Sequence, residues 1–153
     1  MTHLRALGIL GLAAALVIGV GAGAASAMKV GGSAGKAASN ADSSCADYAY
    51  GSLTNSCSTT KSFIVPLPVE TEGSKTLAFR AKGAASTNNV GCRGTAMNDA
   101  GTGYWATPTM YLSQFGSMQD VSLGDLYVGA EAPVYMLCSI DNAGKLFLVE
   151  WEQ

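Results

Sequence analysis

Three pairs of acidic residues could carry out acid–base chemistry in this sequence. Two carboxylates at a suitable separation act as acid and nucleophile, or as acid and base, in glycoside hydrolysis. Each pair here is flanked by turn residues or lies at the chain end, where acidic side chains usually only solvate the surface. We therefore expect a non-enzymatic protein, with a small acid-pair hydrolase as the alternative. The pairs are Glu70 and Glu72, Asp120 and Asp125, and Glu150 and Glu152.

The four cysteines, Cys45, Cys57, Cys92 and Cys138, are the next candidates for chemistry. They lack the paired Cys-x-x-Cys spacing of a zinc site. A catalytic thiol would need a base, and the only histidine, His3, lies in a leader discussed below. An even number of cysteines in a small exported domain indicates two disulfides. We expect no metal and no cofactor.

Three disulfide pairings are possible. Cys45 and Cys57 are close together where the folded domain is expected to begin. Cys92 and Cys138 each alternate with apolar residues, as side chains on one face of a strand do. This pattern favours the pairs 45–57 and 92–138.

The segment "NDAGTGYWATPT" (98–109) contains the candidate binding residues. Tyr104 and Trp105 follow two glycines, and aromatic rings exposed beside Asn98 and Asp99 would stack on a sugar ring or dock a partner. The favoured interpretation, however, is that Trp105 folds back and caps an open end of the fold, and ligand binding by this loop is the alternative. Calcium binding at Asn98 and Asp99 is less favoured than a plain turn, because too few oxygen ligands are present. Trp151, by contrast, is expected in the core, on the same strand face as Phe147 and Val149.

The elements that must position these residues are short segments of period-2 alternation separated by Gly, Asn, Asp and Ser. They predict an all-β fold, an antiparallel β-sandwich of jelly-roll or immunoglobulin-like type with about 7–8 short strands and two disulfides. Two prolines in the first clear strand predict an edge strand. "DNAG" (141–144) predicts a hairpin turn between the last two strands, which Cys138 would then staple to an earlier strand. The expected strands are 62–69, 75–82, 90–97, 109–114, 125–130, 134–140 and 145–151.

Residues 1–27 have the three parts of a secretory signal peptide. His3 and Arg5 precede an apolar run that ends in Ala25-Ser26-Ala27. A membrane anchor is the alternative, but no basic cluster follows the run. We expect a secreted or periplasmic protein without stable membrane insertion after cleavage. The Gly/Ala/Ser-rich residues 28–44 predict a flexible linker, which leaves 45–153 as the sandwich domain.

Charge and composition restrict the partners. Without the leader, eight Lys and Arg face eleven Asp and Glu, a net charge near −3. This weak acidity shows no basic stripe and argues against nucleic acid. The sequence favours a binding or structural module of the periplasm or cell exterior but does not identify its partner. A polysaccharide and another envelope protein, including one in a surface assembly, are the candidates, and a carbohydrate-binding module that uses Tyr104 and Trp105 is the alternative function.

Five short segments between Asp47 and Trp151 also resemble a recurring type of exported bacterial protein, a small cysteine-containing β-sandwich. The resemblance implies this fold and export. It implies no activity and no ligand, so no functional residue is carried over. The segments are "YGSLTN" (50–55), "FIVPLP" (63–68), "VGCRGTAM" (90–97), "YMLCSI" (135–140) and "LVEW" (148–151).

Overall fold

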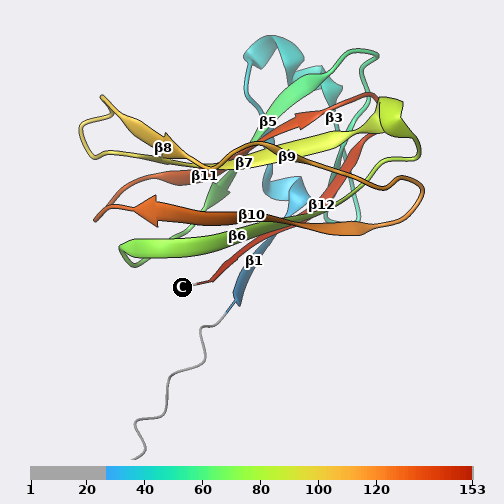
Figure 1. Cartoon of the computed structure of the whole chain (residues 1–153). Helices are drawn as coiled ribbons and strands as arrows, with labels where there is room; N and C mark the ends of the chain where they lie inside the picture. The colour runs from blue at the N-terminus through green and yellow to red at the C-terminus, as the bar shows by residue number, and fades with distance from the viewer. Residues whose placement is uncertain (1–26, 153) are drawn as a thin grey trace, which may run out of the picture.

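Two antiparallel sheets pack face to face in the computed structural model, which describes residues 27–152 (Figure 1). Sheet A has the order β10-β6-β12-β4-β3, with β1 also paired to β12, and sheet B has the order β2-β5-β11-β7-β8, with β9 also paired to β7. The strands of sheet A are β1 (Ala27–Gly31), β3 (Ala46–Ala49), β4 (Ser52–Asn55), β6 (Gly73–Lys82), β10 (Gln119–Val128) and β12 (Lys145–Glu152). Those of sheet B are β2 (Lys36–Ala37), β5 (Lys61–Leu67), β7 (Val90–Met97), β8 (Tyr104–Ala106), β9 (Met110–Tyr111) and β11 (Val134–Ile140).

The expected all-β antiparallel sandwich is therefore confirmed, but residues 27–152 form twelve strands rather than 7–8. The additional strands have two to five residues. Such segments are too short to show a period-2 pattern, so the sequence alone does not distinguish them from loops. Within the described residues, no helix is long and apolar enough to cross a membrane.

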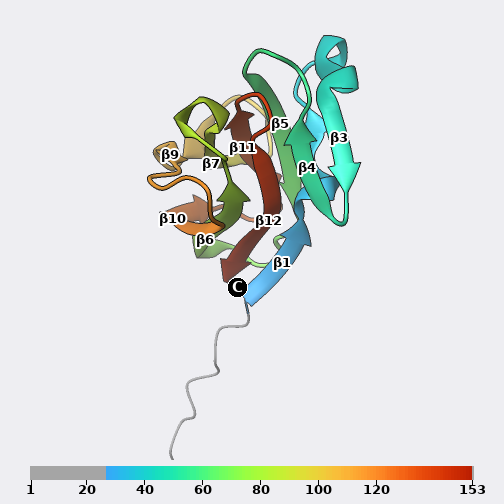
Figure 2. The same cartoon turned by 90° about the vertical axis from the view of Figure 1, so that its right-hand side faces the viewer.

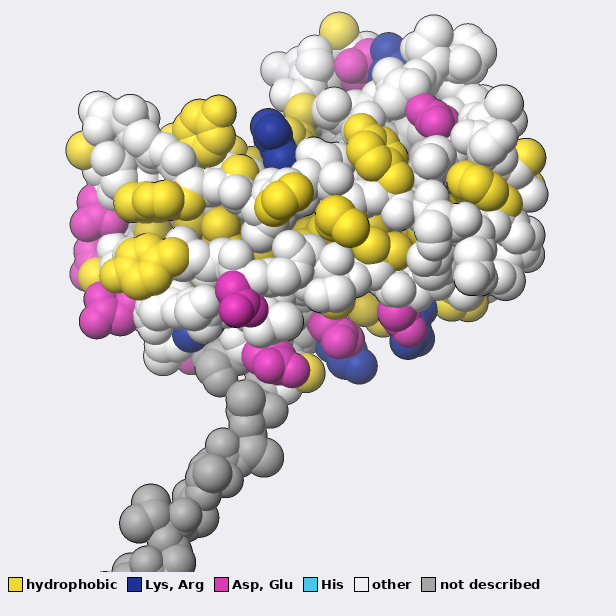
Figure 3. All heavy atoms as spheres, viewed as in Figure 1, with side chains coloured by type: hydrophobic (Ala, Val, Ile, Leu, Met, Phe, Trp, Pro, Cys, Tyr) yellow, Lys and Arg dark blue, Asp and Glu magenta, His cyan; other side chains and the backbone are white. Residues whose placement is uncertain are grey.

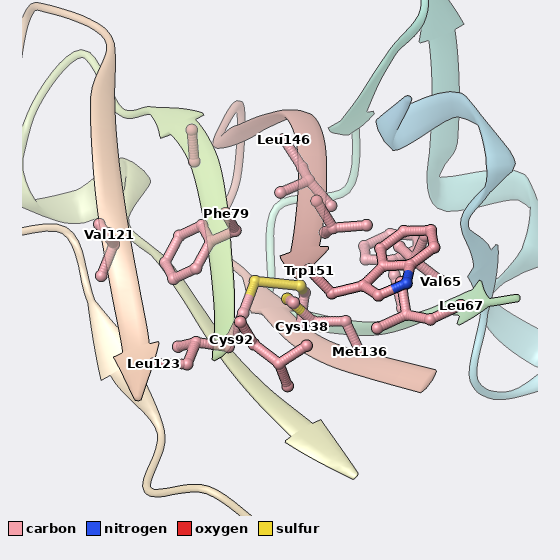
Figure 4. Packing of buried hydrophobic residues seen from close by; sticks show 14 of the residues in the cluster. Val65, Leu67, Phe79, Cys92, Val121, Leu123, Met136, Cys138, Leu146 and Trp151 are labelled. Carbon is pink, nitrogen blue, oxygen red and sulfur yellow. A yellow bond between two sulfur atoms is a disulfide. The ribbon is translucent and has the colours of Figure 1, made fainter. Parts of the chain in front are cut away.

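The core lies between the two sheets and follows from the alternation of the long strands. In β6, Leu77, Phe79 and Ala81 are buried while their neighbours face outward. Trp151 on β12 is 1% exposed, which confirms its expected place in the core. Figure 4 shows labelled side chains of both sheets in this core, among them Phe79 and Trp151 of sheet A and Met136 of sheet B. Each large apolar side chain buried in this way contributes about 1.5–3 kcal/mol.

Both expected disulfides are present. Cys92 on β7 and Cys138 on β11 are direct cross-strand partners within sheet B, and their sulfurs lie in the core (Figure 4). Cys45 and Cys57 close a smaller loop around β3 and β4. The pairing favoured by the sequence is thus confirmed.

The predicted hairpin between the last two strands is wrong. β11 pairs with β5 and β7 in sheet B, whereas β12 pairs with β6, β4 and β1 in sheet A. The connection crosses from one sheet to the other, and backbone bonds from Asp141 N to Asn89 O and from Ala143 N to Asn55 O hold it in place. β11 and β12 each bury one face, and these two buried faces oppose each other across the core, so the strands lie in different sheets. Cys138 therefore staples β11 to β7 within one sheet.

A bulge in β12 also changes one expected side-chain orientation. The register of β12 against β6 shifts between Leu146 and Leu148. Leu146 is buried, and the intervening Phe147 is only partly buried rather than in the core with Val149. An extra residue in a strand reverses the alternation on one side of it.

The flexible linker expected at residues 28–44 is also wrong. β1 pairs with β12 from Ala27↔Glu152 to Gly31↔Leu148, and β2 pairs with β5. The 3-10 turns Gly32–Ala34 and Asn40–Cys45 connect these strands to β3. Backbone hydrogen bonding along β12 and β5 orders this segment although it has few apolar side chains. Figure 2 shows β1 beside the last strand. The predicted leader lies outside the described residues, apart from Ala27.

The prolines lie where sheet B has an open edge. β2 covers β5 only opposite Phe63 and Ile64, so β5 is uncovered on that side at Pro66. The missing N–H of proline therefore removes no ladder bond between β5 and another strand on that side.

Candidate functional site

The turn between β7 and β8 is organised by Asn98. Its Oδ1 accepts hydrogen bonds from the backbone N of Thr102 and Gly103, at 2.9 and 3.1 Å, and its Nδ2 donates to Thr102 Oγ1 at 3.0 Å. Gly101 adopts φ 66°, a left-handed conformation that favours glycine. Asn98 thus uses its polar atoms to hold the turn, and Asp99 is exposed at its tip.

This turn presents Tyr104 and Trp105, but it points them in opposite directions. Tyr104 pairs with Met97 and Trp105 pairs with Ala96 in the β7–β8 ladder. Ala96 is buried between the sheets, so Trp105 lies on the inner side of β8 and Tyr104 on the outer side. The two side chains therefore lie at the same edge of the sandwich but point to opposite faces of β8.

Trp105 is 45% exposed and makes one aromatic contact. Its ring packs edge-on against Tyr127 of β10, with the ring centroids 6.3 Å apart. β8 and β10 are edge strands of different sheets, so this contact lies at an open side of the sandwich. Trp105 partly covers that side and still presents much of its ring to solvent.

The same side of the molecule carries further exposed aromatic rings. Tyr104, Tyr111 and Tyr127 are each more than half exposed. In Figure 3, hydrophobic side chains appear along the side formed by β8, β9 and β10. Aromatic rings left in water at several positions on one side are typical of binding surfaces.

A shallow groove lies on the outer face of sheet B, next to this aromatic side. Tyr111 of β9 pairs with Gly91 of β7, and its ring lies directly over that glycine. A Cβ built on Gly91 would lie 2.2 Å from Tyr111 Cε1, so any larger residue would displace the ring. The groove has a volume of about 150 Å³ and is lined by Ser62, Gly91, Arg93, Thr109, Tyr111, Leu137 and Ser139.

The groove combines one aromatic ring, three hydroxyl side chains and one guanidinium. Arg93 is partly buried, and its side chain forms no hydrogen bond or ion pair with another residue between 27 and 152. Sites for small polar ligands are typically apolar surfaces with a few convergent polar groups. The arrangement can stack a flat ligand and hydrogen-bond its edge.

The acidic pairs are held in other contacts. Asp120 forms a two-point ion pair with Arg80, at 2.6 and 2.8 Å, and this contact lowers the pKa of Asp120 from its usual range. Asp125 accepts a hydrogen bond from Thr76 Oγ1, and Glu150 pairs with Lys29. A general acid needs a raised pKa near the working pH, so the shift at Asp120 has the wrong direction.

Glu70 and Glu72 lie in a second, wider cavity of about 300 Å³ between the β5–β6 and β10–β11 loops. Glu131 joins them from the second loop, and all three are exposed. Within the described part of the chain, no group of three or more His, Cys, Asp or Glu side chains is arranged to hold a metal ion.

The candidate binding residues identified from the sequence do not form one site in the structure. Trp105 and Tyr104 are exposed, Asn98 is a turn residue, and Asp99 stands alone at a loop tip. The groove on sheet B was not predicted. The signal that could have found it is the glycine at 91 inside an otherwise regular strand, since such a glycine often marks close approach of another group.

No protein-family model and no curated protein matches this sequence. Solved structures do match its fold. The C-terminal family 6 carbohydrate-binding module of a marine laminarinase from Zobellia galactanivorans has a TM-score of 0.55 and 12% identity, over 84% of this chain and 100% of that chain. A family 36 module of a xylanase from the hindgut metagenome of Trinervitermes trinervoides has a TM-score of 0.54 and 10% identity, over 82% and 96%.

A mannanase from Podospora anserina that carries a family 35 module also matches. Its TM-score is 0.51 and its identity 9%, over 83% of this chain and 28% of the longer mannanase chain. At these identities the similarity concerns the fold alone, and it establishes that the chain has the β-sandwich architecture of such modules.

Proposed function

We propose that this chain is a non-enzymatic carbohydrate-binding domain that works outside the cytoplasm, in the periplasm or at the cell exterior. The observation that carries the proposal is the set of exposed aromatic rings on one side of the sandwich. The C–H faces of a sugar ring pack against such rings, and hydroxyl side chains beside them can bond its edge. The fold shared with carbohydrate-binding modules supports this choice.

Two features support the location and the absence of catalysis. Two disulfides are typical of proteins that fold in an oxidising compartment. The carboxylates of Asp120, Asp125 and Glu150 contact cations or a hydroxyl rather than forming an acid–base pair.

The test is a titration of the purified protein with a panel of soluble polysaccharides, followed by calorimetry and by tryptophan fluorescence. We expect saturable binding that Tyr111→Ala or Trp105→Ala weakens by about tenfold or more, as removal of a stacking ring does. Tyr50→Ala is the matched control, because Tyr50 is fully exposed in the β3–β4 turn at the opposite edge of sheet A. Absence of binding across neutral and charged polysaccharides would overturn the proposal.

A further inference from the structure

The outer face of sheet B differs in charge from the rest of the molecule. None of the six strands described in sheet B contains an Asp or a Glu. The strands of sheet A contain Asp47, Asp120, Asp125, Glu150 and Glu152. In Figure 3 most acidic side chains on the visible side lie at one end and along the sheet A layer. Thus a protein that is acidic overall has one face whose strands carry no negative side chain.

Two cations lie on this face, in one row across the sheet. The pairing register joins Lys36 to Ile64, Ile64 to Leu137, and Leu137 to Arg93. Paired residues point to the same side, so all four project outward. With strands about 4.8 Å apart, the two ends of the row are separated by roughly 14 Å.

Neither Lys36 nor Arg93 forms an ion pair with a carboxylate of the described residues. The ion pairs within residues 27–152 involve Lys29, Lys61 and Arg80, and not Lys36 or Arg93. Arg93 is partly buried in the groove beside Tyr111. A partly desolvated guanidinium without an anion favours a ligand that brings one.

The position of Tyr111 relative to Arg93 defines what that ligand must look like. Tyr111 lies over Gly91, and Arg93 is two residues further along the same face of β7, or roughly 7 Å. A sugar ring stacked on Tyr111 with its exocyclic carbon directed along the strand would place that carbon near the guanidinium. A planar carboxylate on that carbon matches the two-point geometry of arginine.

We infer that the sheet B groove recognises a polysaccharide that contains uronic acid residues. Tyr111 stacks on one sugar ring, Arg93 binds the carboxylate, and Lys36 at the far end of the row attracts a second uronate of the same chain. Ser62, Thr109 and Ser139 supply hydroxyls to the sugar edges. This inference rests on the proposed carbohydrate binding and names its substrate class.

The test compares three probes on the full-length purified protein by calorimetry: polygalacturonate, its fully methyl-esterified form, and dextran sulfate. We expect polygalacturonate to bind at least about tenfold more tightly than the methyl ester, because the ester removes the charge and keeps the sugar rings. Its affinity should fall as salt is added. Dextran sulfate binding as tightly as polygalacturonate would overturn the assignment to uronate.

Variants locate the site. Arg93→Gln should remove most of the preference for polygalacturonate over its ester. Arg93→Lys should keep only part of this preference, because an ammonium lacks the planar guanidinium that forms two parallel hydrogen bonds with a carboxylate. Arg80→Gln is the control for net charge, since Arg80 pairs with Asp120 on the other sheet. An equal effect of Arg80→Gln and Arg93→Gln would show that the preference is a general charge effect and would overturn the inference.

Glycine variants test the stacking platform without removing any polar group. Gly91→Ala should displace the Tyr111 ring and weaken binding of both the ester and the acid by about tenfold. Gly129→Ala is the control, because no heavy atom lies within 4 Å of a Cβ built there. Tight binding of a neutral polysaccharide that is unchanged in Arg93→Gln and Gly91→Ala would overturn this inference and leave the proposed function standing. Absence of all binding would overturn both.

Discussion

The two tryptophans lie in opposite environments. Trp105 is 45% exposed at the edge of the sandwich, and Trp151 is 1% exposed in the core. In Trp151→Phe, the remaining emission should come from Trp105 and should be quenched strongly by acrylamide. In Trp105→Phe, the emission from Trp151 should lie at shorter wavelength and resist quenching, because the indole is shielded from solvent.

Stern–Volmer slopes for the two variants measure this difference. Equal slopes would mean that Trp105 is folded into the protein, as in the interpretation favoured from the sequence. Circular dichroism of Trp151→Phe serves as the folding control, since removing part of a buried ring leaves a cavity.

The Arg80–Asp120 ion pair predicts a pH dependence of stability. The hydrogen bond and the charge of Arg80 lower the pKa of Asp120 below its unfolded value of about 3.9. A group whose pKa is lower in the folded state stabilises the protein above the unfolded pKa, and this stabilisation is lost as the pH falls through the folded pKa. Asp120→Asn should therefore lower the urea midpoint slightly at pH 7 and have no effect near about pH 2.

Asp125→Asn is the matched control for this measurement. Asp125 lies on the same strand and contacts a hydroxyl rather than a cation. If Asp120→Asn changed the midpoint by the same amount at both pH values, the ion pair would not be the cause.

At the scale of single residues, the sequence left the exposure of Trp105 open, with packing favoured, and gave no partner for Tyr111. The glycines before Tyr104 indicated a loop that could expose aromatic rings, and Tyr104 and Trp105 are exposed. Tyr111 and Gly91 are 20 positions apart, and their contact depends on which strand β9 joins. No local pattern contains that information.

At the scale of secondary-structure elements, the more deeply buried of the two disulfides joins β7 to β11. Cys92 and Cys138 are 0% exposed, and the bond closes a loop with a sequence separation of 46. Chain-entropy arithmetic gives about 4 kcal/mol for a loop of that size and about 3 kcal/mol for the 12-residue separation of Cys45 and Cys57. The double variant Cys92→Ala/Cys138→Ala should therefore lose more stability than Cys45→Ala/Cys57→Ala.

Urea unfolding of the two double variants checks this order. The cavity left between the sheets adds to the loss at Cys92 and Cys138, whereas Cys57 is only partly buried. A larger loss for the Cys45–Cys57 pair would mean that the first loop, rather than the core, limits the stability of the fold.

The long strands could be predicted from the sequence, but their assignment to sheets could not. Alternation in β5, β6 and β7 identified the residues that face the core. The turn at 141–144 has the residue types of a hairpin, yet it connects β11 and β12 across the core. Turn residues determine local backbone direction, and the choice of neighbour depends on the burial of both strand faces against distant segments.

On the scale of the whole molecule, the segment that follows the predicted leader is part of the sandwich. Gly32 is buried where this segment crosses β12, and a Cβ built on it would lie 2.2 Å from Leu146 O and 3.2 Å from Leu53 N. Both atoms belong to backbone that cannot move easily. Gly32→Ala should therefore destabilise the protein by about 1–3 kcal/mol, as overpacking does.

Thermal and urea unfolding of Gly32→Ala test this role, with Gly129→Ala as the control. Unchanged stability in Gly32→Ala would mean that the close approach of Gly32 to the backbone of Leu146 and Leu53 does not limit the stability of the fold. The Gly/Ala/Ser content of residues 28–44 led to the wrong prediction of a flexible linker, because main-chain pairing with β12 and β5 needs no large side chains.

The pairing of Ala27 with Glu152 brings the two ends of the described chain to one corner of the molecule. Figure 1 shows this corner on the sheet A side, away from the outer face of sheet B. A short glycine-rich bridge should therefore join the ends, and a circular permutant opened at the exposed turn near Gly101 should keep the same fold. For the same reason, the domain is suited to insertion into a surface loop of another protein with the sheet B groove facing outward.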